Sequence, residues 1–428
     1  MRRILSFVVL VFLASAFLAK AIPAQNETKQ ELQLSAPADS SEESMAQAAQ
    51  VEQDKEERLQ QAIKYQKAKN TLYFVDQGYG ILFLVLFLFL GISAFLRRQI
   101  EKITRKRFWV VAFYTLLFLI IAFIVGFPTS YYGFSLEHKF ELSNQTLLQW
   151  FGEELLGLLV IGIIALIVVE GIYLALKKAP RTWWIYVSVV FIGFTVVLVN
   201  LAPILILPLF NVYTPLPEGE LRDRLVSLSH RANVEVENIF AMDMSKQTKK
   251  ANAMFTGLGN TKRIVLGDNL VDEFTTDEVE VVIAHEMGHN LMHHIWWGIL
   301  FSAILTGIGF FIIHLTGPRI ITRFRNKLKI DDMADVAGLP LIFLIFVIYG
   351  LITMPVFPAF SRHMERQADK FALDMTQNKE AFISAMDELA YMNLADPNPS
   401  PIIEFLLYDH PPISKRIKFA EEYESGTK

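Results

Sequence analysis

Six apolar segments, each long enough to cross a lipid bilayer, constrain the fold of this chain more than any other feature. Each is close to the ~20 residues that a helix needs to span ~30 Å of hydrocarbon. Hydrophobic residues make up 53 % of the 428 residues, and the mean hydropathy is +0.35. The sequence therefore predicts a mainly α-helical, polytopic membrane protein. The segments run at Gly78–Leu96, Phe108–Phe127, Leu155–Leu176, Trp183–Leu207, Ile295–Leu315 and Leu339–Phe357.

The N-terminus carries a seventh apolar segment that has the features of a signal peptide. Met1-Arg2-Arg3 precedes an apolar stretch from Ile4 to Leu18, and Ala19-Lys20-Ala21 has the small-x-small pattern of a signal-peptidase site. We expect residues 1–21 to be a signal peptide or a first membrane anchor, which gives about seven transmembrane helices. Residues 22–72 are polar and are expected to form an exported, partly helical segment.

Basic loops predict how the chain is oriented in the membrane. Three loops rich in Lys and Arg, at Arg97–Arg107, Lys177–Arg181 and Arg319–Lys329, fall on one side in a seven-span count. Positively charged loops face the cytoplasm. The polar regions 208–294 and 361–428 are therefore expected to face away from the cytoplasm.

The first of these polar regions contains the motif HExxH, as His285-Glu286-Met287-Gly288-His289. We expect a helix from about Asp277 to His294, with Thr275 or Thr276 as its N-cap. Residues four apart lie on one face of a helix, so both imidazoles can bind one metal ion such as Zn²⁺. Glu286 is then placed to take a proton from a water molecule, as in metal-assisted hydrolysis of an amide bond. A chance pentapeptide on an amphipathic helix is the alternative, and a third metal ligand would decide between them.

A candidate for the third ligand follows the last apolar segment. Residues Ser361–Ala372 are expected to form a helix with Glu365 and Asp369 four apart on one face. Glu365 can bind the metal, and Asp369 can accept the N–H of a ligating histidine and orient it. A solvated charged helix is the alternative interpretation, and HExxH favours the metal site.

Two further features bear on the site. A hairpin is expected where Asn252–Thr256 and Arg263–Leu266 flank Gly257-Leu258-Gly259-Asn260. Its edge strand could hold an extended peptide, with Asn252 and Ala253 as contacts, unless the hairpin is purely structural. His293 and His294 are expected beside the site or at the membrane boundary rather than as ligands. Glu170, inside an apolar segment, is expected to line an internal chamber or to lie near the bilayer edge.

Taken together, these motifs resemble the type I CAAX prenyl proteases, which are membrane zinc metalloproteases of the HExxH–Glu kind. The resemblance extends from about Asn144 to Arg416. It is carried by HExxH together with Tyr213–Gly219, Ser245-Lys246, Asn252-Ala253, Thr261–Leu266, Ser361-Arg362, Glu365, Ala368–Ala372, Asp409–Pro412 and Arg416.

The resemblance implies specific roles for residues of this chain. His285, His289 and Glu365 would hold one Zn²⁺ per chain, in a zincin-like catalytic domain with a small sheet. Glu286 would be the general base, and His410 would stabilise the oxyanion. Asp369 would accept a hydrogen bond from the N–H of a ligating histidine, and Arg416 would orient the carboxylates of the site.

The expected function is that of a zinc-dependent membrane metalloendopeptidase that acts on peptide or protein substrates in a lipid bilayer. An outward-facing site in a bacterial inner membrane suits processing or quality control of exported or membrane-lodged proteins. The net charge of −4 gives no reason to expect a nucleic-acid partner, and the absence of cysteine excludes thiolate ligands and disulfides. The expected parts are residues 73–207 and 295–357 in the membrane, and 208–294 and 358–428 in the catalytic region.

Three other functions remain as alternatives. The resemblance itself suggests processing of C-terminal CAAX-type prenylated peptides, although that family's site faces the cytosol. An intramembrane protease of the site-2 kind also uses HExxH, but it places the motif in a transmembrane helix and takes its third ligand from an Asp in another span. A transporter or membrane chaperone would explain the spans and would leave HExxH and Glu365 without a role.

Overall fold

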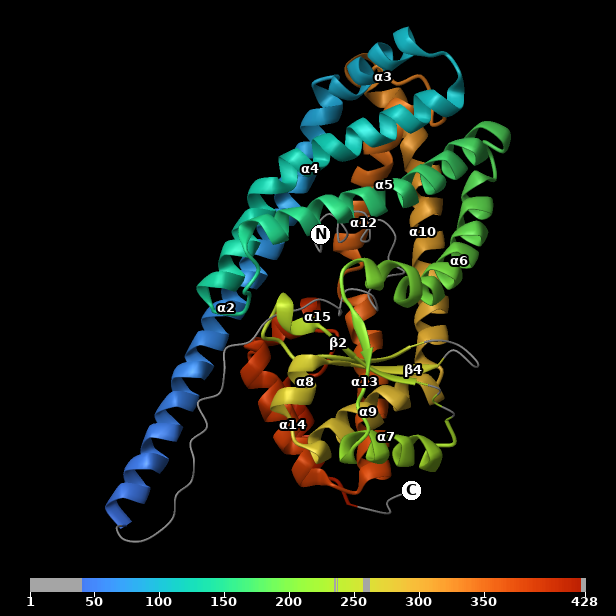
Figure 1. The fold of residues 1–428 in the computed structure, drawn as a ribbon. Coiled ribbons are helices and arrows are strands. Elements are labelled where there is room, and N and C mark those ends of the chain that lie inside the picture. Colours follow the sequence, from blue (N-terminus) through green and yellow to red (C-terminus); the bar gives the residue numbers. More distant parts are fainter. Residues whose placement is uncertain (1–40, 235, 237, 257–261, 425–428) are drawn as a thin grey trace.

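The protein is described here from a computed structural model that covers residues 41–234, 236, 238–256 and 262–424. The expected signal peptide or first anchor, residues 1–21, lies outside the described residues. A bundle of long helices forms one part of the molecule, and a smaller part that contains the sheet lies at one end of it (Figure 1).

Five helices of the described chain are long and apolar enough to cross a membrane, and a bent helix pair makes a sixth candidate. These six correspond to the six apolar segments of the sequence, which confirms a polytopic helical protein. α6 continues through a π-helical turn (Ala202–Ile206) and a 3₁₀ turn (Leu207–Leu209). The helices of this part are α2 (Ser41–Phe89), α3 (Ile92–Ile103), α4 (Arg107–Lys139), α5 (Leu147–Lys178), α6 (Trp183–Leu201), α10 (His294–Arg323), α11 (Arg325–Leu328) and α12 (Leu339–Ile352). α13 (Val356–Thr376) leads from it into the smaller part.

Helix α2 differs from the expected span at both ends. It is a single helix of 49 residues, about 74 Å long at 1.5 Å per residue, so it extends far beyond the bilayer into the polar segment that precedes the span. It ends at Phe89 rather than Leu96 because Gly91 adopts a left-handed conformation (φ 72°) and starts α3 in a new direction.

The last span is bent rather than straight. The chain bends by 53° between α12 and α13, across a break at residues 353–355. Pro355 has no N–H to continue the helical hydrogen bonds, and the new direction carries α13 out of the bundle and into the smaller part. The predicted helix Ser361–Ala372 is therefore confirmed as the continuation of α13.

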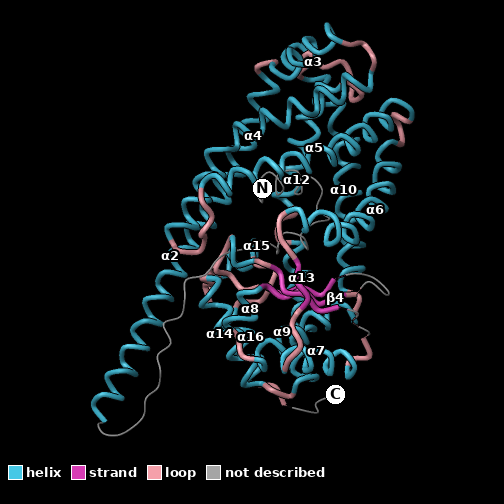
Figure 2. Tube along the Cα trace, in the orientation of Figure 1, coloured by secondary structure: helices cyan, strands magenta, loops and turns pink. Residues whose placement is uncertain are grey.

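A four-stranded mixed sheet forms the centre of the smaller part (Figure 2). Its order is β1-β2-β4-β3, with β2 and β4 parallel and the two outer pairs antiparallel. The expected hairpin is confirmed, because β3 pairs with β4 and Ala253 lies opposite Leu266; its turn lies outside the described residues. β3 is an edge strand. The strands are β1 (Tyr213–Pro215), β2 (Asn238–Met242), β3 (Ala253–Thr256) and β4 (Arg263–Gly267).

Helix α9 (Thr276–Leu291) carries the HExxH motif through the core of this part. It packs against β3 on one side and against α13 and α14 on others. Eleven of its residues, including Val279, Ile283 and Met287, are buried, so the motif is held in a packed helix. The other helices are α7 (Glu220–Arg231), α8 (Asp268–Glu273), α14 (Lys379–Asn393), α15 (Pro401–Leu407) and α16 (Ile413–Glu421), with 3₁₀ turns at Met244–Lys246 and Val336–Gly338.

A cavity of about 950 Å³ lies between the helical bundle and the smaller part. Its wall includes residues of α2, α4 and α5 on the bundle side and residues of β3, α9 and α16 on the other side. Glu170 is not among the wall residues. Its carboxylate instead lies 3.7 Å from the guanidinium of Arg107, the first residue of α4.

Candidate metal centre and active site

Local sequence explains why the HExxH segment is helical. Thr275 caps α9 by accepting from the N–H of Glu278, whose side chain in turn accepts from the N–H of Thr275. The expected helix is thus confirmed, with Thr275 as the N-cap and with its end at Leu291 rather than His294. The chain turns at His293, which has a left-handed conformation (φ 57°), and α10 begins at His294.

Gly288 allows α9 and α13 to approach closely. A Cβ atom at this position would lie 3.2 Å from Cβ of Phe371 and 3.3 Å from Cα of Ala368, closer than ordinary van der Waals contact. This approach brings Glu365, one turn before Ala368 on α13, against the two histidines of α9.

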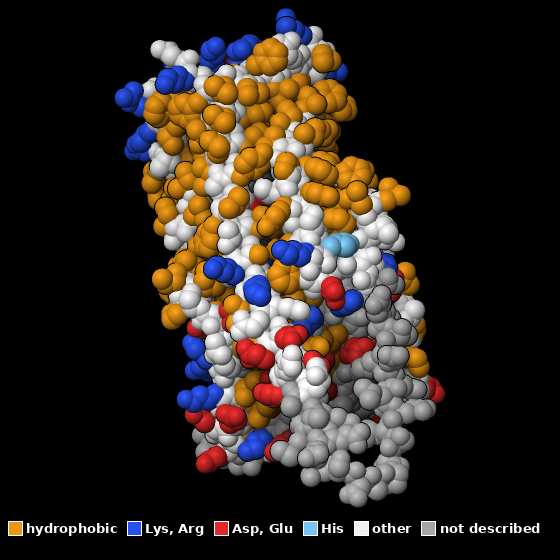
Figure 3. All heavy atoms as spheres, turned by 90° about the vertical axis from the view of Figure 1, so that its left-hand side faces the viewer, with side chains coloured by type: hydrophobic (Ala, Val, Ile, Leu, Met, Phe, Trp, Pro, Cys, Tyr) orange, Lys and Arg blue, Asp and Glu red, His pale blue; other side chains and the backbone are white. Residues whose placement is uncertain are grey.

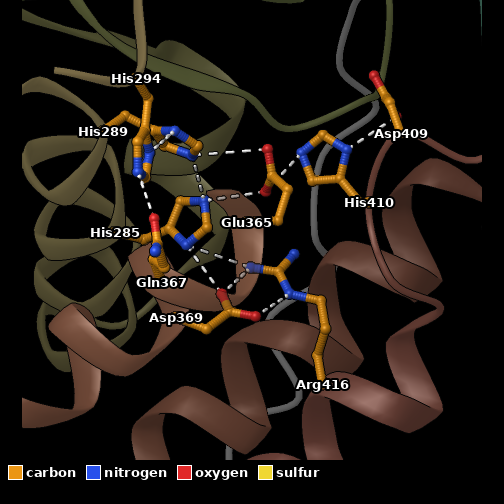
Figure 4. Close-up of polar contacts among 9 residues, drawn as sticks. All are labelled: His285, His289, His294, Glu365, Gln367, Asp369, Asp409, His410 and Arg416. Carbon is orange, nitrogen blue, oxygen red and sulfur yellow. Dashed lines mark hydrogen bonds and ion pairs between the residues drawn. The ribbon is translucent and has the colours of Figure 1, made fainter. Parts of the chain in front are cut away.

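The side chains of His285, His289 and Glu365 converge on one point (Figure 4). Nε2 of His285 lies 3.1 Å from Nε2 of His289 and 3.3 Å from Oε2 of Glu365, and Nε2 of His289 lies 3.5 Å from Oε1 of Glu365. All three side chains are buried. Ligands about 2.0–2.1 Å from a tetrahedral ion are roughly 3.3–3.4 Å apart, so this donor set fits one metal ion of zinc's size.

Asp369 and Arg416 lie next to Nδ1 of His285, the ring nitrogen that faces away from His289 and Glu365. Nδ1 of His285 lies 2.8 Å from Oδ1 of Asp369. Arg416 donates to both oxygens of that carboxylate, and its Nη2 also lies 3.4 Å from Nδ1 of His285. Burial would lower the pKa of His285, but its hydrogen bonds to Asp369 and Glu365 outweigh burial and raise the pKa to about 9. The ring is therefore held in one orientation, with Nε2 toward the other donors.

His410 reaches the same point from the segment between α15 and α16. Its Nε2 lies 2.9 Å from Oε2 of Glu365, and its Nδ1 lies 2.8 Å from Oδ1 of Asp409. Asp409 orients this ring much as Asp369 orients His285. The side chain of His410 is 24 % exposed, so unlike the buried donors it can meet a molecule in the cavity.

The cavity connects the donor set to the remaining expected site residues. Glu286 and His410 lie on its wall, as do Asn252 and Ala253 at the start of the edge strand β3. β3 packs directly against α9. A peptide chain lying in this cavity can therefore contact the edge strand and the HExxH helix together.

His289 contacts His294, one of the two histidines that the sequence predicts beside the site or at the membrane boundary rather than as ligands. His294 is buried and its Nδ1 lies 3.0 Å from Nδ1 of His289, while its Nε2 lies 2.9 Å from Oε1 of Gln367. Gln367 is absent from the sequence predictions because one glutamine on a charged helix face carries no recognisable pattern. Its position two residues after Glu365 becomes meaningful only when α10 lies beside α13.

Two protein families match adjoining parts of the chain. Residues 40–212 match the family described as CAAX prenyl protease N-terminal, five membrane helices, and residues 215–424 match peptidase family M48.

Similar proteins are known from both sequence and structure. The chain is 28 % identical to "Uncharacterized metalloprotease YhfN" of Bacillus subtilis, over 87 % of each protein. It is 30 % identical to "CAAX prenyl protease 1" of Saccharomyces cerevisiae, over 69 % of this chain and 68 % of that protein. The crystal structure of S. mikatae Ste24p superposes with a TM-score of 0.77 at 23 % identity, over 99 % of this chain and 97 % of that one.

The fold, the convergent His-His-Glu group and these similarities lead to one conclusion. The chain belongs to the CAAX prenyl protease 1 family within peptidase family M48, and it is an integral membrane metalloendopeptidase.

Proposed function

We propose that this peptidase uses one zinc ion per chain, held by His285, His289 and Glu365. Two imidazoles and a carboxylate are the ligand set of several catalytic zinc sites, and they leave a coordination position open. The separations of the three donor atoms support this assignment. When bound, zinc supplies Lewis-acid activation of water and of the scissile carbonyl.

The chain's own residues would provide proton transfer and charge stabilisation. Glu286 is the general base that takes a proton from the attacking water and later delivers it to the leaving amine. His410, whose Nδ1 lies 2.8 Å from Oδ1 of Asp409, would carry protons on both ring nitrogens and donate from Nε2 to the oxygen that becomes negatively charged. Arg416 and Asp369 keep the ring of His285 in place. The shared cavity wall of Glu286 and His410 is the observation that carries this mechanism.

The substrate would be a peptide segment in an extended conformation. Among the strands that the structure describes, β3 pairs with β4 alone. An extended chain can add to such a sheet edge by main-chain hydrogen bonds. Asn252 and Ala253 lie where this edge enters the cavity, which supports them as the contacts.

We further propose that the active site faces away from the cytoplasm, as in a bacterial inner-membrane protein. Lys and Arg side chains gather at the end of the bundle opposite the sheet, beyond a broad apolar surface (Figure 3). This end carries twelve exposed cations, and the positive-inside rule favours the cytoplasm for them. They are Arg98, Lys102, Arg105, Lys106, Lys177, Lys178, Arg181, Arg319, Arg323, Arg325, Lys327 and Lys329.

With this orientation, the substrates would be exported or membrane-lodged proteins, in quality control or processing. A second candidate is processing of C-terminal CAAX-type prenylated peptides, which the names of the relatives favour. Cleavage of one peptide in prenylated and unmodified forms separates the two. Equal rates support the first, and a strict need for the prenyl group supports the second.

The purified full-length protein provides the test of the mechanism. Glu286→Gln should keep one zinc per chain and lose about 10²–10⁴-fold in peptide cleavage, whereas Glu421→Gln, on the exposed end of α16, should cleave like the wild type. Full activity of Glu286→Gln would rule the mechanism out. For orientation, a reporter active only outside the cytoplasm is fused after Lys428, and a silent reporter would contradict an outward-facing site.

A further inference from the structure

His294 lies directly behind His289, on the side away from the proposed metal position (Figure 4). It is the first residue of α10, it is 2 % exposed, and its Nδ1 lies 3.0 Å from Nδ1 of His289. The left-handed conformation of His293 turns the chain between α9 and α10 and brings His294 back beside the last turn of α9.

Hydrogen bonds continue from His294 to the surface of α13. Nε2 of His294 lies 2.9 Å from Oε1 of Gln367, and Nε2 of Gln367 lies 3.3 Å from Nε2 of His363. Gln367 and His363 are both exposed and sit four residues apart on the same helix face. A chain of four side chains therefore leads from a candidate metal ligand to solvent.

The direction of every bond in this chain follows from the first one. A metal ligand uses the lone pair on Nε2, so neutral His289 must carry its proton on Nδ1. This N–H donates to Nδ1 of His294, which therefore carries its own proton on Nε2.

The remaining two hydrogen bonds agree with this direction. The Nε2–H of His294 meets the carbonyl oxygen of Gln367, which is an acceptor, and the amide nitrogen of Gln367 then donates to His363. Each contact among these four side chains therefore joins one donor to one acceptor.

The two histidine ligands thus have different supports. His285 donates to Asp369, an ionised carboxylate fixed by Arg416. His289 donates to a neutral imidazole whose tautomer is set by an amide. Groups that hold the outer N–H of a ligating histidine orient the ring, and their loss commonly costs 10–100-fold in metal affinity.

We propose that His294 is the positioning residue for His289, and that Gln367 acts through it by fixing its tautomer. The proposal rests on the zinc site proposed above. It assigns a specific task to the junction of α9 with the membrane helix α10: the first residue of a membrane span holds a ligand of the active site.

Equilibrium zinc affinity of the purified full-length protein, measured by competition with a chromophoric chelator, provides a readout independent of activity. His294→Ala should bind Zn²⁺ about 10–100-fold more weakly. His294→Asn, which offers an oxygen acceptor, should recover part of this loss. Gln367→Leu should weaken binding by roughly two- to tenfold, and His363→Ala, at the exposed end of the chain, should change it less than twofold.

Each outcome bears on the proposal in one direction. Unchanged zinc affinity in His294→Ala overturns the proposal. An equal loss of affinity in His294→Asn and His294→Ala overturns it too, because a hydrogen-bond acceptor at this position would then make no difference. If His294→Ala does not fold, Gln367→Leu decides: wild-type affinity in that variant overturns the proposal.

His285→Ala separates this inference from the metal site itself. If His285→Ala binds zinc as tightly as the wild type, the zinc site is wrong. If His285→Ala loses zinc while the His294 and Gln367 variants retain wild-type affinity, only the positioning role fails.

Discussion

Arg416 donates two hydrogen bonds to Asp369, from Nε to Oδ2 at 2.9 Å and from Nη2 to Oδ1 at 2.5 Å. Both side chains are buried, and the same carboxylate accepts from His285. Attraction to Asp369 outweighs the desolvation that would lower the pKa of Arg416, so the guanidinium stays charged. Because Arg416 holds the buried carboxylate of Asp369 in place, that carboxylate can fix the orientation of His285, a proposed metal ligand.

Replacing Arg416 should damage the metal site more than the fold of the membrane helices. Arg416→Gln leaves the carboxylate of Asp369 buried without its cation, and we expect metal affinity to fall about 10–100-fold. Arg416→Lys should lose part of this affinity, because one ammonium cannot reproduce the two-pronged geometry. Chelator competition measures both. Equal affinity in all three proteins would contradict the supporting role.

Metal affinity should depend on pH through His285. Without metal, the pKa of this imidazole is raised to about 9, so the ring is protonated near neutral pH and must lose a proton to bind a cation. Affinity should therefore rise by about tenfold per pH unit up to pH 9 from this proton and level off above it. Zinc binding in weakly buffered solution should release the proton, and calorimetry in buffers of different ionisation enthalpy counts it. Zero proton release at pH 7.5 would contradict the raised pKa.

Gly288→Ala tests the close approach of α9 and α13. Alanine favours the helix by up to ~1 kcal/mol, but the new Cβ would lie 3.2 Å from Cβ of Phe371, and overpacking typically costs ~1–3 kcal/mol. We expect lower thermal stability and weaker metal binding as Glu365 moves away.

Gly171→Ala provides the matched control for that variant. This α5 glycine has no atom within 4 Å of an added Cβ, so the substitution should be neutral or slightly stabilising. If Gly288→Ala behaves in the same way, the contact between the helices does not limit the site.

Lys250 should connect the edge strand to the membrane helices. Its Nζ lies 2.5 Å from Oε2 of Glu137 on α4 and 3.0 Å from the hydroxyl of Tyr65 on α2, and it stands two residues before Asn252. Lys250→Met leaves the partly buried carboxylate of Glu137 without this cation, although the hydroxyl of Tyr65 still donates to it. The loss should cost about 1–3 kcal/mol and raise KM for peptides more than it lowers kcat. A double-mutant cycle with Glu137→Gln should give a coupling of roughly 0.5–3 kcal/mol in thermal unfolding. Additive effects would show that the pair does not couple the two parts.

Much of the fold could be predicted because its signals are local. Apolar segments of membrane length predict spanning helices from composition alone, and Thr275 with Glu278 marks the start of α9. HExxH places two candidate metal ligands on one helix face whatever the rest of the chain does. The C-terminal end of α2 and the bend between α12 and α13 are not specified locally. They depend on Gly91 and on the residues around Pro355, where the sequence permits a turn without specifying its direction.

The sequence by itself determined the membrane helices and the three candidate metal ligands, His285, His289 and Glu365, because each depends on periodicity or composition within one segment. Only the tertiary structure decided that Glu365 meets both histidines, that Arg416 stands behind Asp369, and that His294 and Gln367 support His289. These contacts join residues from α9, α10, α13 and α16, and their existence depends on how closely the helices pack, down to the absence of a side chain at Gly288. Such packing is a property of the whole core and has no signature in any single stretch of the chain.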